Sequence, residues 1–164
     1  MLNLTPIFFW LARLCAMLAG MLLTTITLMT CISIVGREAV GKPITGDFEL
    51  SGVAAGAAIA LFMPLCQVRR GNIIVDFFTA RCSAVTINIL DRIGAFVLSA
   101  CFMLLAWRTA VGGLNAFSSA SGTMILGFPE WVTYACMVPA FLLTGLIALA
   151  QAAGLMNDEP RALL

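Results

Sequence analysis

Histidine is absent from this chain of 164 residues, and charged residues make up only 10% of it. Without histidine the chain lacks the commonest general base and metal ligand, and it cannot hold haem between two imidazoles. Soluble domains contain about 25% charged residues, so a water-soluble fold is excluded. The net charge is +1 and no run of Lys or Arg occurs, so nothing indicates a nucleic-acid partner.

Motifs that carry catalysis are also missing. The sequence contains no Gly-rich phosphate loop, no nucleophile elbow and no zinc-type spacing. Its six cysteines are scattered without a C-x-x-C pair, and scattered cysteines in apolar segments usually pack as small hydrophobic side chains. We therefore predict no enzyme activity, no cofactor and no metal site.

Four long apolar stretches account for most of the chain, which is 62% hydrophobic. A membrane-spanning helix needs about 20 apolar residues. The expected spans are 14–36, 50–68, 93–113 and 131–153, the third of which runs past Arg108. The sequence thus predicts an all-α integral membrane protein with four transmembrane helices in a single membrane domain, 1–164.

The connector 72–92 has a different pattern. Ile74, Phe78, Cys82, Val85 and Ile89 recur at steps of three and four residues, as on one face of a helix. This spacing predicts an amphipathic surface helix between the second and third spans. Two interpretations stay open: the helix lies on the inner membrane surface, or it docks against another subunit.

The distribution of cations predicts the orientation, because cytoplasmic segments of membrane proteins are enriched in Lys and Arg. With the N-terminus inside, six of the nine cations fall on the cytoplasmic side, and three fall outside. The inner set is Arg13, Arg69, Arg70, Arg81, Arg92 and Arg161, and the outer set is Arg37, Lys42 and Arg108. Both termini are therefore expected in the cytoplasm.

A stripe of small residues marks the second span. Gly52, Gly56 and Ala60 recur every four residues, which lets another helix approach closely. We expect these residues to pack against a helix, either of this chain or of a partner protein.

Polar residues near the ends of the spans form a second group of candidates. They are Arg37, Glu49, Arg69, Arg70 and Asp76. Glu49 begins the second span, where an acid suits the positive end of the helix dipole. We expect it to have a structural role at the membrane interface, with Arg37 as a candidate partner. A role as a coupling-ion site is the alternative.

Three segments together carry a family resemblance. They are Gly36-Arg37-Glu38 with Gly46-Asp47-Phe48-Glu49-Leu50, the run 67–76, which reads Gln-Val-Arg-Arg-Gly-Asn-Ile-Ile-Val-Asp, and the run 126–134, which begins Leu-Gly-Phe-Pro-Glu-Trp. In order and spacing the chain resembles the small membrane subunit of tripartite ATP-independent periplasmic (TRAP) transporters. Asn72 stands where that family usually has His.

The resemblance implies a role in uptake across the bacterial inner membrane. In such systems a periplasmic substrate-binding protein delivers an organic acid to a large polytopic subunit, which carries it inward with sodium. The small subunit is expected to brace the large subunit within the membrane lipid, and to help dock the binding protein, without transporting anything itself. Which organic acid is carried, and which helix faces the large subunit, does not follow from the sequence.

Three other functions are compatible with parts of the pattern. One is the small subunit of a tripartite tricarboxylate transporter, which is also a four-helix accessory protein. Another is a self-assembling small exporter that uses Glu49. The third is the membrane anchor of an oxidoreductase, although a chain without histidine cannot ligate haem by imidazole.

Overall fold

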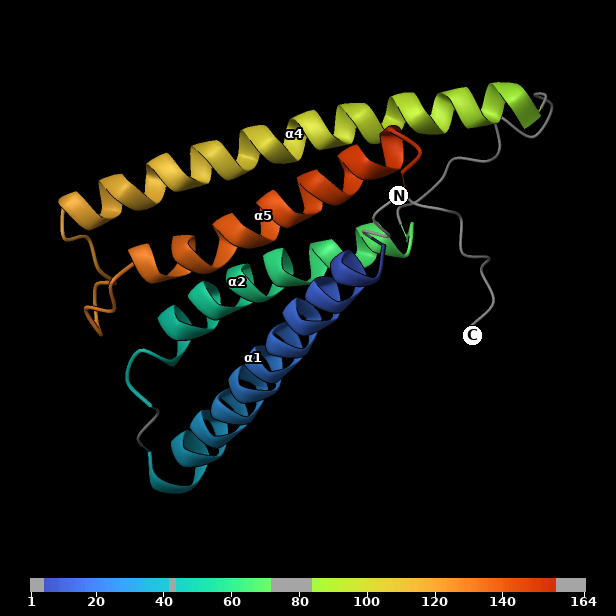
Figure 1. The fold of residues 1–164 in the computed structure, drawn as a ribbon. Coiled ribbons are helices and arrows are strands. Elements are labelled where there is room, and N and C mark those ends of the chain that lie inside the picture. The colour runs from blue at the N-terminus through green and yellow to red at the C-terminus, as the bar shows by residue number, and fades with distance from the viewer. Residues whose placement is uncertain (1–4, 42–43, 72–83, 156–164) are drawn as a thin grey trace.

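A computed structural model describes residues 5–41, 44–71 and 84–155 of the chain. These residues form four α-helices and their loops, together with one isolated β-bridge between Gly122 and Pro129. The helices are α1 (Thr5–Val40), α2 (Asp47–Val68), α4 (Ala84–Ser118) and α5 (Trp131–Ala152) (Figure 1). Each is long and apolar enough to cross a membrane, which confirms the predicted all-α class with four spanning helices.

Two of the helices are much longer than the apolar stretches suggested. α1 contains 36 residues and α4 contains 35. At 1.5 Å per residue each is about 53 Å long, against a hydrocarbon core of about 30 Å. α2 and α5, with 22 residues each, match one bilayer. The predicted ranges 14–36 and 93–113 stop near charged residues, but a helix continues through a charge whose long side chain can reach water.

The predicted amphipathic connector 72–92 falls only partly within the described chain, because residues 72–83 lie outside it. The remaining residues, 84–92, are the first turns of α4, which continues from them to Ser118 without a break. The apolar spacing of residues 85, 89 and 93 therefore belongs to one continuous helix.

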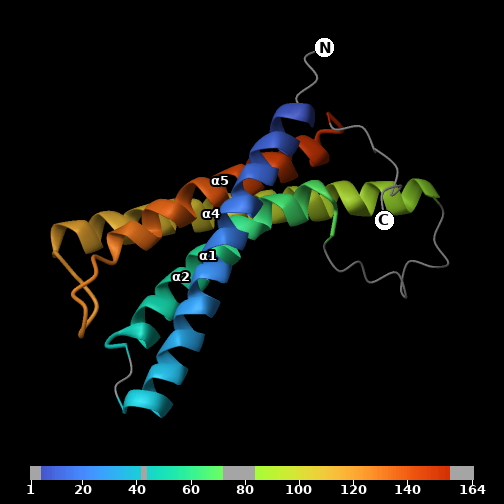
Figure 2. The same cartoon turned by 90° about the horizontal axis from the view of Figure 1, so that it is seen from below.

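The four helices form an open layer in the order α4, α5, α2, α1 (Figure 1). α5 packs against α4 on one side and α2 on the other, and α2 also packs against α1. Figure 2 shows α1 inclined across α2. In their most apolar windows, 33% of the residues of α2 and 28% of those of α5 are buried, compared with only 11% in α1 and in α4. The middle of the layer is thus closed by the chain itself, and both flanks are open.

Small side chains make the close packing in the middle of the layer possible. The buried residues of α2 include Ala54, Ala57, Ala58 and Ala60, and those of α5 include Ala140, Gly145, Ala148 and Ala150. In lipid, helices associate through van der Waals contact and hydrogen bonds rather than through a hydrophobic driving force, and small residues allow both. The sequence of α2 therefore favours a position between two other helices.

α4 and α5 approach each other closely at two glycines. The Ser99 hydroxyl donates a hydrogen bond of 2.9 Å to the Gly145 carbonyl oxygen. A Cβ at Gly145 would lie 3.2 Å from Met103 Cγ, and a Cβ at Gly113 would lie 2.8 Å from Tyr134 Cβ. Larger residues at either glycine would push the two helices apart.

A buried pair of amides joins α2 to α5 at one end of the layer. Gln67 Nε2 donates to Gln151 Oε1 over 2.7 Å, and Gln151 Nε2 donates to the backbone carbonyl oxygen of Gln67 over 2.9 Å. Beside this pair, Phe8 packs with Leu65 against the buried residues Ala12 and Ile147. We call this the amide end of the layer. The opposite end, where the α1–α2 and α4–α5 connections lie, is the loop end.

Candidate functional site

Glu49 connects α2 to the loop between α4 and α5. It lies in the first turn of α2, and its carboxylate accepts hydrogen bonds from two backbone N–H groups of that loop. The Ile125 N–H lies 2.9 Å from Oε1 and 3.1 Å from Oε2, and the Leu126 N–H lies 3.2 Å from Oε2. Hydrogen bonds to a charged acceptor are about twice as strong as neutral ones, so this contact fixes the loop on the end of α2.

The loop is shaped to receive the carboxylate. Thr123 N–H donates to the Phe128 carbonyl oxygen, and Phe128 N–H donates to Thr123 Oγ1, both over 3.0 Å. Gly127 turns the chain with a φ of +62°, a conformation that glycine adopts without steric cost. Because these bonds close the turn from within, the N–H groups of Ile125 and Leu126 are available to Glu49. Successive N–H groups of this kind form an anion-binding concavity.

Asp47 makes the corresponding connection to α1. Ser33, a buried residue of α1, donates its hydroxyl hydrogen bond to Asp47 Oδ2, and its Oγ accepts the Ile44 N–H over 3.2 Å. Asp47 Oδ1 accepts the Phe48 N–H over 2.7 Å. Both acids lie in the first turn of α2, where the helix dipole stabilises negative charge. The first turn of α2 therefore joins α1 on one side and the α4–α5 loop on the other.

Gly46 allows this junction to close. It has a φ of +81°, and a Cβ at this position would lie 2.4 Å from Leu126 Cγ and Cδ1. The position thus requires glycine twice, once for its backbone conformation and once for the space that Leu126 occupies. The contact brings residue 46 against the same loop that Glu49 binds.

The junction presents a group of apolar side chains, which we call the loop-end patch. Its members are Ile44, Phe48, Met124, Ile125 and Leu126. Phe48 is 87% exposed and Met124 is 100% exposed. Apolar groups held on the surface in this way typically mark contacts with another protein or with a membrane. Polar contacts hold the backbone beneath the patch, while its side chains face outward.

The stripe of small residues in α2 is divided between two environments. Ala60 is buried, and a Cβ at Gly56 would lie 3.4 Å from Met137 Cε of α5. A Cβ at Gly52 would meet nothing within 4 Å. The part of the stripe nearer the amide end therefore faces this chain, and Gly52 faces away from it.

The other predicted polar candidates lie apart from the junction. Arg37 is exposed in the last turn of α1, and the hydrogen bonds of Glu49 go to the α4–α5 loop instead. Arg69 ends α2 at the amide end, followed by Arg70 with a φ of +49°. Asp76 lies outside the described residues.

Sequence reasoning missed the backbone N–H groups of the α4–α5 loop, together with Ser33. The Gly-Phe-Pro run at 127–129 and Gly46 were the available signals for tight turns. Among the described residues, no group of three His, Cys, Asp or Glu is placed to hold a metal ion. What the arrangement does is hold two loops and present an apolar surface.

Four helices of membrane length in an open layer, joined by structured loops at one end, define a small multi-pass membrane protein. The family model described as "Tripartite ATP-independent periplasmic transporters, DctQ component" matches residues 26–158, which is well over half of the chain. The chain therefore belongs to the DctQ family of TRAP transporter small membrane subunits, as its resemblance predicted. No curated protein and no solved structure matches it.

Proposed function

We propose that this chain is the non-catalytic small subunit of a sodium-driven, binding-protein-dependent organic acid importer of the bacterial inner membrane. Its role is to brace the large transport subunit. The family to which the chain belongs supplies one component of a tripartite transporter. The observation that carries the proposal is the open layer of helices. In the most apolar window of each flanking helix, only 11% of the residues are buried by the chain itself. A subunit that packs beside a larger membrane protein needs such faces.

A brace must keep its own shape, and polar contacts support this at both ends of the layer. The Gln67–Gln151 pair ties α2 to α5 at the amide end, and Glu49 ties α2 to the α4–α5 loop at the loop end. Hydrogen bonds between membrane helices are worth about 0.6 kcal/mol on average, so each tie is modest. Together they fix the position of α2 along its length.

Glu49 favours the bracing role over the exporter alternative. Three hydrogen bonds from the loop backbone engage its carboxylate. A residue that binds and releases a coupling proton or cation would have to break those bonds in every cycle. The contacts of this carboxylate support a structural role.

The orientation follows from the cations. Arg69, Arg70 and Arg92 lie at the amide end, which by the positive-inside tendency is cytoplasmic. The loop end is then periplasmic, and both termini are cytoplasmic. In this orientation the loop-end patch faces the side where the substrate-binding protein arrives. An apolar patch on a fixed loop supports a part in docking that protein.

The first test is mass spectrometry of proteins that co-purify with the tagged chain from its native membrane in mild detergent. We expect one large polytopic protein in near-equal amount. The sequence of that protein would also separate a TRAP system from a tripartite tricarboxylate transporter. Recovery of the chain alone, as a homo-oligomer, would contradict the accessory role and revive Glu49 as a transport residue.

A pair of matched substitutions then tests how α2 is used. Gly56→Leu should destabilise the chain itself, because the new side chain meets Met137 of α5, and overpacking costs about 1–3 kcal/mol. Gly52→Leu should leave the isolated chain folded, since its Cβ enters open space.

The readouts are thermal unfolding of the purified chain and yield of the complex. Loss of the complex in Gly52→Leu with an unchanged unfolding temperature would place the large subunit on the Gly52 face of α2. Normal stability and normal complex yield in Gly56→Leu would contradict the packing of α2 described above.

A further inference from the structure

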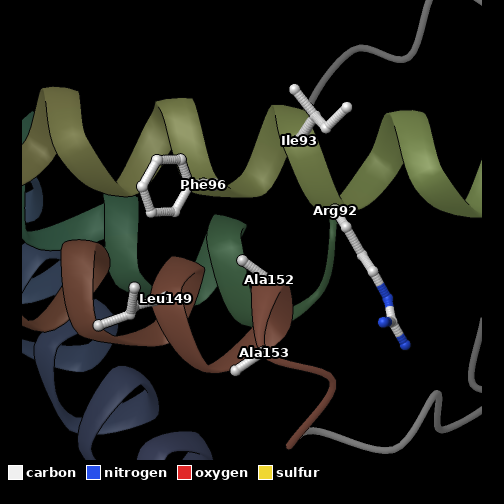
Figure 3. Close-up of a pocket in the computed structure, with 6 residues that line it drawn as sticks. All are labelled: Arg92, Ile93, Phe96, Leu149, Ala152 and Ala153. Carbon is white, nitrogen blue, oxygen red and sulfur yellow. The ribbon is translucent and has the colours of Figure 1, made fainter.

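A shallow groove lies between α4 and α5 at the amide end of the layer. Its volume is about 360 Å³. The residues that line it are Arg92, Ile93 and Phe96 from α4, and Leu149, Ala152 and Ala153 from the end of α5 (Figure 3). The two alanines leave the space that larger side chains would fill.

The groove is polar at one end and apolar along its length. Ile93, Phe96 and Leu149 are exposed along the walls, and Phe96 and Leu149 lie on the side of the groove that leads toward the loop end (Figure 3). Arg92 lies at the other end, and its side chain extends from α4 past the end of α5 (Figure 3). One guanidinium nitrogen lies 3.1 Å from the position that a Cβ of Gly154 would occupy.

The end of α5 leaves the guanidinium with donors to spare. The carbonyl oxygens of Leu149, Ala150 and Gln151 accept the N–H groups of residues 153, 155 and 154, over 3.0 Å in each case. Within the part of the chain that the structure describes, Arg92 forms no ion pair. A guanidinium has five N–H donors in a planar fork that matches the oxygens of a phosphate.

We propose that this groove binds a phospholipid of net negative charge, with its phosphate on Arg92 and one acyl chain along Ile93, Phe96 and Leu149. The occupant follows from the order of the lining groups. A cation at the membrane boundary followed by an apolar wall directed inward repeats the order of headgroup and tail. The inference depends on the chain lying in a membrane, and does not depend on its role in transport.

Native mass spectrometry of the full chain in detergent tests the proposal. The probes are phosphatidylglycerol and phosphatidylcholine with identical acyl chains. We expect phosphatidylglycerol to bind about tenfold more tightly, because the choline cation of phosphatidylcholine offsets the phosphate charge that Arg92 binds, whereas phosphatidylglycerol keeps a net negative charge. Excess inorganic phosphate should not displace the lipid, because it lacks the acyl chain.

Three variants separate the parts of the site. Arg92→Gln should abolish the preference for phosphatidylglycerol, and Ala152→Trp should weaken the binding of both lipids by filling the groove. Arg108→Gln is the matched control, because Arg108 is also an exposed arginine of α4 but does not line the groove. Circular dichroism and thermal unfolding establish that each variant is folded.

Equal binding of the two lipids by the wild-type chain would overturn the proposal, as would an unchanged preference in Arg92→Gln. A photoreactive residue at position 152, introduced in native membranes, tests the alternative occupant. Cross-linking to a lipid supports the proposal, and cross-linking to a polypeptide would show that a partner subunit covers the groove instead.

Discussion

The loop end and the amide end of the layer are held together by different chemistry. At the loop end an ionised carboxylate, Glu49, binds backbone N–H groups of a loop. At the amide end two neutral side chains, Gln67 and Gln151, bind each other, with 4% and 7% of their surface exposed. The free-energy cost of a charge is small where water and headgroups solvate it. Burial in an apolar interior instead favours neutral groups whose hydrogen bonds are satisfied. The comparison indicates that a charged group holds the loop end, where water reaches it, and that neutral groups hold the helices together at the amide end.

The largest effect should come from closing the space at Gly46. Gly46→Ala forces a residue with a Cβ into a φ of +81° and against Leu126. We expect a loss of about 2–4 kcal/mol in stability, from left-handed strain and overpacking together. Thermal unfolding of the purified chain measures it.

Gly41→Ala is the control for this substitution. Gly41 has a φ of +69°, and a Cβ there would meet nothing within 4 Å, so the variant should show only the strain. If both variants lost the same stability, the contact between Gly46 and Leu126 would have no part in holding the loop.

A smaller and local effect is expected from Glu49→Ala. Without the carboxylate the N–H groups of Ile125 and Leu126 lose their acceptor, so hydrogen exchange at these two amides should accelerate. Exchange at the amide end should not change. Glu38→Ala, which removes an exposed acid of α1, is the control and should leave the loop amides protected. If the Ile125 and Leu126 amides exchanged as slowly in Glu49→Ala as in the wild type, the hydrogen bonds within the loop would be sufficient to keep its structure.

The smallest effect is expected at the amide end. Gln151→Leu removes both bonds between the two glutamines, and we expect a cost of about 0.6–1.7 kcal/mol, the range measured for hydrogen bonds between membrane helices. Replacing both glutamines with leucine should restore part of the loss, because no new unpaired amide then remains from the pair. A double variant that is less stable than Gln151→Leu alone would contradict this account.

The sequence predicted the helices well and their ends less well. The four apolar stretches mark α1, α2, α4 and α5, because a helix in lipid needs about 20 apolar residues and little else in the chain meets that requirement. α1 and α4 extend beyond the expected spans 14–36 and 93–113 on both sides, and Arg13 and Arg92 lie within these helices. Charged residues in the sequence indicate where the membrane ends, but they do not indicate where the helix ends.

The partners at the candidate site were beyond the reach of the sequence. Glu49 was expected at the membrane interface, but its partners are backbone N–H groups 76 and 77 positions away. Every residue except proline carries such a group, so no side-chain pattern could mark these two. Gln151 pairs with Gln67 across 84 positions, and an isolated glutamine in an apolar run does not indicate which helix it will meet.

The unequal helix lengths have a consequence for the membrane around the protein. Membrane helices tilt by about 20° on average. At that tilt α1 and α4 reach about 50 Å along the membrane normal, and α2 and α5 reach about 31 Å. The hydrocarbon layer covers about 30 Å of this, so at this tilt we expect α1 and α4 to extend beyond the hydrocarbon layer and α2 and α5 to match its thickness. A partner protein that binds α1 or α4 beyond the headgroups would therefore contact a continuous helix and not a loop. A displacement of the partner would then be transmitted directly to the membrane-spanning part of that helix.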